Sequence, residues 1–224
     1  MPRHVHLSIP LDTCMFSPLQ LQPVTALRLA MNVGTLSINE QIDDFRILLK
    51  EFGIAFVVVG ASINYLEPFN FFSATSIDLE SGSILRKEGG LLVSTCHIKS
   101  QDQRVASVQV LSRPMKISQT EALDAVPTRI QGSLRERFQD DEIDDSPLTR
   151  ALDQEASRIR EEGEFITRGF YSFKISRDEC EPADQWQFIL LPAFVGRSRE
   201  SIIFKAEDSR LKLGLSCPLI RFEA

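Results

Sequence analysis

Residues 57–68 read Val-Val-Val-Gly-Ala-Ser-Ile-Asn-Tyr-Leu-Glu-Pro, and they continue an apolar run that begins at Ile54. The run is rich in β-branched side chains, which favour strands. Glu67-Pro68 closes it, because proline lacks the N–H that a strand ladder needs. The stretch therefore predicts a strand over 54–65 that ends in a turn.

A helix is predicted immediately before this strand, over residues 36–52. Gly53 follows it at the position where helices commonly end. Apolar side chains recur at helical spacing and form one stripe: Leu36, Ile42, Phe45, Leu48, Leu49 and Phe52. We expect a long amphipathic helix that packs against the strand.

Three further segments after the turn have strand composition. They span residues 69–80, 83–99 and 104–117, with turn residues at Ser81-Gly82 and at 100–102 between them. A short strand is also predicted near residues 5–9. The order of strand, helix and four strands predicts an α+β fold in which an antiparallel sheet wraps around one helix.

The second half of the chain begins with a linker and then repeats part of this order. Residues 118–164 are acidic and poor in aromatic side chains, and we expect them to be partly helical, over 148–160. An alternating pattern over 165–175 then precedes an apolar helix over 188–205 and a strand-like run over 211–222. These segments predict a strand, a helix and a second strand.

Composition excludes several classes of protein. The chain has 224 residues, is 43% hydrophobic and carries a formal net charge of −6, which argues against a nucleic acid or an anionic membrane as its main partner. It has neither a long uninterrupted apolar stretch nor a signal pattern. The four cysteines are scattered without metal-ligand spacing. We expect a soluble cytoplasmic protein with no metal and no cofactor.

Three segments resemble hotdog-fold acyl thioesterases of the 4-hydroxybenzoyl-CoA thioesterase type. Residues 178–199 are similar to the strand-to-helix elbow of these enzymes, residues 42–46 to part of their central helix, and residues 57–68 to the strand that follows. The resemblance implies a complete hotdog copy over 1–117, the linker over 118–164, and an incomplete second copy over 165–224.

The incomplete second copy leaves three explanations open: a shortened chain, a split gene, or a half-copy that docks on the first copy. In each case a strand edge and a half-covered helix would be exposed, which invites pairing with another chain. We therefore expect a homo-oligomer, or pairing with another hotdog chain.

The elbow supplies the first candidate catalytic residue. Residues 179–184 resemble the Asp-x-Asp-Pro-Ala-Gly sequence of the family, with Glu181 at the position of the catalytic carboxylate. Glu181 could attack a thioester carbonyl or activate water, while the amides of the following helix stabilise the oxyanion. Asp184 replaces the usual glycine and weakens the match. The alternative is an acidic first turn that only stabilises the helix.

Other site residues follow from the same resemblance. Gln185, Trp186 and Gln187 would contact substrate beside the elbow, and Tyr65 could line the pocket, although large aromatic residues are more often plain core. In the first copy, Asn32 and Gly34 fall where the family has its substrate-contacting turn. The segment over 16–31 would then rim an acyl tunnel or form a surface loop.

Glu40 and Asp43 on the central helix are alternative carboxylates, because some hotdog thioesterases use one there. The competing interpretation is a solvated helix face.

The resemblance implies hydrolysis of an acyl thioester of CoA or of an acyl carrier protein. Two alternatives remain open at this point. One is a carrier-protein-dependent dehydratase or acyltransferase of fatty-acid or polyketide biosynthesis, since one fold hosts several reactions. The other is a non-catalytic hotdog protein that binds an acyl chain or acts as a scaffold.

Overall fold

A computed structural model of the chain describes residues 4–42, 44–117, 125–138, 154, 157–158, 161, 171–179, 187–205, 219 and 221–223. Its main feature is a single antiparallel sheet of seven strands in the order β1-β3-β4-β5-β2-β7, with β6 paired to β5. The strands are β1 (Val5–Pro10), β2 (Ile54–Tyr65), β3 (Ser76–Arg86), β4 (Leu91–Ser100), β5 (Gln103–Ile117), β6 (Ala125–Pro127) and β7 (Arg221–Glu223).

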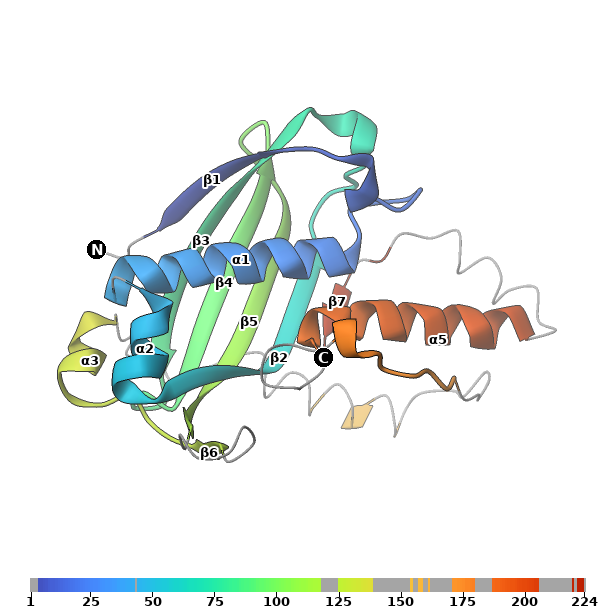
Figure 1. The fold of residues 1–224 in the computed structure, drawn as a ribbon. Helices are drawn as coiled ribbons and strands as arrows, with labels where there is room; N and C mark the ends of the chain where they lie inside the picture. The colour runs from blue at the N-terminus through green and yellow to red at the C-terminus, as the bar shows by residue number, and fades with distance from the viewer. Residues whose placement is uncertain are drawn as a thin grey trace.

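The helix α1 (Pro23–Ile42) runs across one face of this sheet, as Figure 1 shows. We call the face that α1 covers the inner face and the opposite one the outer face. The shorter helical elements are α2 (Phe45–Phe52), α3 (Gly132–Arg137), α5 (Leu191–Lys205), η1 (Thr13–Met15), η2 (Phe71–Ser73), η3 (Arg177–Glu179) and η4 (Phe188–Leu190).

The prediction of one helix over 36–52 is wrong. The central helix is α1, which starts at Pro23, and α2 is a separate helix whose start is capped by the Asp44 carboxylate accepting from the Arg46 N–H. Proline suits the first helical position because its missing N–H would have no partner there. The segment over 16–31, expected as a loop or tunnel rim, therefore forms the first half of α1 from Pro23 onwards.

The strands were predicted in the right order, but one turn was misplaced. Ser81 and Gly82 lie inside β3, and the chain instead turns at residues 87–90, within the segment predicted as one strand over 83–99. Lys87, Glu88 and Gly89 have positive φ angles there, as tight hairpins require. In the sequence, the Gly89-Gly90 pair is the residue pattern that indicates this hairpin turn.

The inner face and α1 enclose most of the core. Alternate strand residues such as Leu79, Ile98, Val108 and Ile63 point inward and are almost completely buried. Two clusters of buried apolar residues lie under α1, one toward its start and one toward its end together with α2 and α3. Ile130, Leu134, Phe138 and Phe222 belong to these clusters too, so the core draws on residues beyond 117. The domain boundary at residue 117 stays a prediction.

The described residues after 117 add β6, α3, η3, η4, α5 and β7 to this fold. α5 precedes β7, and β7 pairs antiparallel with β2 through Ser62↔Glu223, Ile63↔Phe222 and Asn64↔Arg221. Residues 171–175, the described part of the strand expected over 165–175, form no ladder. The helix expected over 188–205 is confirmed as η4 and α5. The second copy over 165–224 stays a prediction.

Candidate functional site

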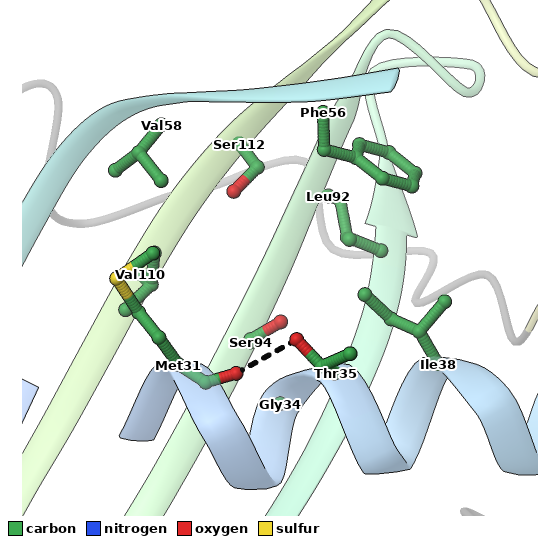
Figure 2. A pocket seen from close by; sticks show the side chains of 10 residues that line it. All are labelled: Met31, Gly34, Thr35, Ile38, Phe56, Val58, Leu92, Ser94, Val110 and Ser112. Atoms are coloured by element: carbon green, nitrogen blue, oxygen red, sulfur yellow. Dashed lines mark hydrogen bonds between the residues drawn. The ribbon is translucent and has the colours of Figure 1, made fainter. Parts of the chain in front are cut away.

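A cavity of about 110 Å³ lies between the middle of α1 and the inner face of the sheet. Figure 2 shows the side chains that line it: Met31, Gly34, Thr35, Ile38, Phe56, Val58, Leu92, Ser94, Val110 and Ser112. The four α1 residues recur at intervals of three or four positions and so share one face of the helix. The remaining residues come from β2, β4 and β5.

Small side chains on three elements leave this space open. Gly34 allows α1 to approach β4, because a Cβ added at Gly34 would lie 3.4 Å from the Ser94 Cβ. Ser94 pairs with Val110 across β4 and β5, and Ser112 pairs with Leu92 in the next inward-facing row. Serine at these two positions is smaller than the inward-facing Leu92 and Val110 that pair with them.

Three hydroxyl groups line this mostly apolar cavity. The Thr35 hydroxyl donates to the Met31 carbonyl at 3.0 Å, and Ser94 Oγ lies 2.8 Å from Ser83 Oγ on the neighbouring strand. Gln41 Nε2 donates to the Ser83 carbonyl at 3.0 Å. The sequence interpretation missed Thr35, Ser94 and Ser112. Serines at inward positions of apolar strands were the available signal.

The elbow region has described residues on both sides of residues 180–186. The Gln187 N–H donates to the Glu179 carbonyl at 2.8 Å, which brings the two ends of the elbow together. Glu179 Oε2 accepts from the Ser176 N–H at 2.9 Å and from the Ser176 hydroxyl at 3.1 Å. Phe188, Ile189 and Leu191 then pack against the core beside α1. The described residues that follow 180–186 thus pack against the core under α1.

Several predicted site residues lie outside the described residues: Asp43, Glu181, Gln185 and Trp186. Gln187 is described and is half-buried at the start of η4. Glu40 is exposed on α1 and does not line the cavity. The carboxylate assignments therefore stay predictions.

The first-copy residues do not form the expected turn. Asn32 and Gly34 lie within α1 rather than before it, because the helix starts earlier than predicted. Asn32 is exposed, while Gly34 lines the cavity. Tyr65 packs against the core, and its hydroxyl donates to the Leu21 carbonyl at 2.8 Å. Burial raises the pKa of Tyr65, so its phenol stays protonated.

Charged side chains gather on the outer face, away from the cavity. Glu80 on β3 forms an ion pair with Lys99 and faces His6 and His97 in the ladder. The lysine lowers the pKa of Glu80. His97 is half-buried, with Nδ1 3.3 Å from the Ser107 hydroxyl, and burial lowers its pKa.

The described residues contain neither a cluster of metal-ligating side chains nor a membrane-spanning helix. No group of three or more His, Cys, Asp or Glu side chains in this part of the chain could hold a metal ion. None of the helices among the described residues is long and apolar enough to cross a membrane.

Comparison with known proteins gave matches in structure only. No protein-family model matches the sequence, and no curated protein matches it. An acyl-ACP thioesterase from Bacteroides thetaiotaomicron is similar to this chain with a TM-score of 0.61 at 8% identity, over 98% of this chain and 79% of that one.

Two other solved structures match at a similar level. The 12:0-ACP thioesterase from Umbellularia californica has a TM-score of 0.60 at 9% identity, over 87% of this chain and 70% of that one. A protein described as an oleoyl thioesterase from Lactobacillus plantarum has a TM-score of 0.61 at 10% identity, over 86% of this chain and 69% of that one. At these identities the similarity concerns the fold. The chain has the α+β hotdog fold that the sequence predicted.

Proposed function

We propose that this protein hydrolyses acyl thioesters of CoA or of an acyl carrier protein. The observation that carries the proposal is the cavity between α1 and the inner face, in a fold shared with proteins described as acyl thioesterases. A mostly apolar space with a few polar groups suits an acyl chain. The hydrolase is favoured over a carrier-dependent tailoring enzyme because three similar structures, with TM-scores of 0.60 to 0.61, are described as thioesterases.

The proposed catalytic group is the Glu181 carboxylate, acting directly on the thioester carbonyl or through a water molecule. The backbone amides at the start of the following helical segment would stabilise the negative charge that develops on the carbonyl oxygen. Glu179 is a poorer candidate, because its carboxylate already accepts two hydrogen bonds from Ser176.

We also propose that the protein acts as a homo-oligomer. In α5, only Pro192, Phe194 and Ile203 are buried among 15 residues, while Val195 and Phe204 are 46% and 67% exposed. By contrast, ten of the 20 residues of α1 are buried. A second hotdog surface over α5 would bury these apolar side chains.

The test is hydrolysis of a panel of acyl-CoA and acyl-pantetheine thioesters, followed by thiol release. Glu181→Gln is expected to lower kcat by roughly 100-fold or more, the usual range for general acid–base and covalent groups. Glu136→Gln is the matched control, since Glu136 is an exposed glutamate on α3. The variants Glu40→Gln and Asp43→Asn test the central helix in parallel.

Circular dichroism shows whether each variant keeps its fold. A loss of turnover in Glu40→Gln or Asp43→Asn, with Glu181→Gln fully active, would assign the catalytic carboxylate to the substituted residue instead. An absence of turnover on every thioester would contradict the proposed activity.

A further inference from the structure

Ser112 is a mostly buried residue whose hydroxyl faces the cavity. It is only 8% exposed, it lies on β5 between Val58 and Leu92 in the ladder, and it lines the cavity. In Figure 2 its hydroxyl points from β5 toward α1. Thr35 and Ser94 have the partners Met31 and Ser83. Within the described residues, the Ser112 hydroxyl has none.

An unpaired hydroxyl in such a place affects which ligand can bind. Without ligand, water molecules can enter a cavity of this size and satisfy the Ser112 hydroxyl. A plain hydrocarbon chain would displace the water and leave the hydroxyl without a partner, which costs affinity. A ligand with its own oxygen at this level would replace the lost hydrogen bond.

The other two hydroxyls strengthen this preference. Thr35 uses its only hydrogen on the Met31 carbonyl, but its oxygen can still accept a hydrogen bond, as can the oxygens of the Ser83–Ser94 pair. The Ser112 hydroxyl can donate as well as accept. The cavity therefore offers at least one donor and several acceptors in an otherwise apolar lining, which matches a hydroxyl or keto group better than a methylene group.

We infer that the cavity selects acyl groups that carry an oxygen substituent, as a hydroxyl or keto group, over hydrocarbon chains of the same length. This inference rests on the proposed function, because it assigns the cavity to the acyl part of a thioester. The size of the cavity sets the scale of the recognised part: an engineered cavity of about 150 Å³ binds benzene, so about 110 Å³ holds roughly four non-hydrogen atoms.

The experiment compares the CoA thioester of octanoic acid with those of hydroxyoctanoic acids in which the hydroxyl is moved along the chain one carbon at a time. The proteins are the wild type, Ser112→Ala and Ser107→Ala. Ser107 is the matched control, a half-buried serine on the same strand that faces outward to His97. The measured quantities are kcat/KM for each thioester and the calorimetric affinity for each free acid.

The wild type is expected to prefer at least one hydroxy isomer over octanoyl-CoA by about three- to tenfold, the value of one hydrogen bond. Ser112→Ala should lose this preference and hydrolyse octanoyl-CoA at least as well as the wild type, a result that mere destabilisation of the fold would not give. Ser107→Ala should keep the preference.

The inference is overturned if the wild type hydrolyses octanoyl-CoA without preferring any hydroxy isomer, or if Ser112→Ala keeps the preference. The thioesterase proposal survives either result. If no thioester is hydrolysed, the proposed function fails. The calorimetric affinities for the free acids then test whether Ser112 selects an oxygen substituent. A hydroxy acid bound more tightly, with the difference lost in Ser112→Ala, supports selection by Ser112, and equal or absent binding refutes it.

Discussion

Gly34 of α1 faces Ser94 of β4 so closely that a Cβ on the glycine would lie 3.4 Å from the serine Cβ and 3.5 Å from its Oγ. Both distances are ordinary van der Waals contacts. The central helix thus approaches the sheet beside the cavity, with room for one added methyl group and no more. This relationship makes Gly34 a sensitive position for both stability and cavity shape.

Gly34→Ala is expected to raise the free energy of unfolding by about 0.5–1 kcal/mol, because alanine is the better helix former in a helix interior and its methyl group fits against Ser94. Gly34→Leu should destabilise the protein by about 1–3 kcal/mol through overpacking. Urea denaturation measures both changes.

The control for this pair is Gly196→Ala. Gly196 lies inside α5 and has nothing within 4 Å of an added Cβ, so the substitution reports helix propensity alone. If Gly34→Ala is less stable than Gly196→Ala by more than about 1 kcal/mol, the added methyl group overpacks against Ser94.

The sequence predicted the sheet better than the helices. The apolar, β-branched composition over 54–65 and 104–117 identified β2 and β5 almost to the residue. The position of α1 was missed because its apolar residues continue from 23 to 42 and surround much of the helix, so they give no clear stripe. The prolines before it were read as loop signals.

The cavity could not be predicted from the sequence, because it depends on a register that only the fold supplies. Ser94 and Ser112 are 18 positions apart, and they come together because β4 and β5 pair as Ser94↔Val110 and Leu92↔Ser112. The elbow was found from the resemblance instead. Its anchoring through Glu179 and Gln187 depends on backbone hydrogen bonds that side-chain identity does not reveal.

Tyr65→Phe is expected to lower the free energy of unfolding by about 1–2 kcal/mol. The substitution removes the hydroxyl that donates to the Leu21 carbonyl, and Leu21 is only 1% exposed, so the carbonyl loses a partner that water cannot easily replace. Thioester turnover should not change, because Tyr65 does not line the cavity. Thermal or urea unfolding of Tyr65→Phe beside Tyr171→Phe measures the effect. Equal stability of the two variants would contradict the structural role of this hydrogen bond.

The Glu80–Lys99 pair predicts a pH-dependent contribution to stability. Lys99 lowers the pKa of Glu80 below its usual 4.5, so the pair stabilises the folded state above that value and the contribution is lost as the pH falls through the lowered pKa. Lys99→Met should cost about 0.5–1 kcal/mol at neutral pH, since both side chains are partly exposed.

A double-mutant cycle with Glu80→Gln isolates the pair from the neighbouring histidines. The coupling energy should shrink toward zero in acid. Arg129→Met is the control, because the Arg129–Glu88 pair is more exposed, at 55% and 74%, and should contribute little at any pH. A coupling energy that stays constant down to the pH of acid unfolding would show that the pair acts by packing rather than by charge.

The exposed apolar side chains of α5 predict that self-association depends on this helix. Phe204→Glu is expected to raise the dissociation constant of the oligomer by about 10- to 100-fold, because a buried phenylalanine contributes about 1.5–3 kcal/mol and glutamate would place a charge in the interface. Light scattering over a range of protein concentrations measures the mass of each species. Phe72→Glu is the control, since Phe72 is 93% exposed but lies in η2, between β2 and β3. If the wild type is monomeric at every concentration, or if Phe72→Glu dissociates the oligomer as strongly as Phe204→Glu, then α5 is not the surface that pairs, and its exposed side chains need another explanation.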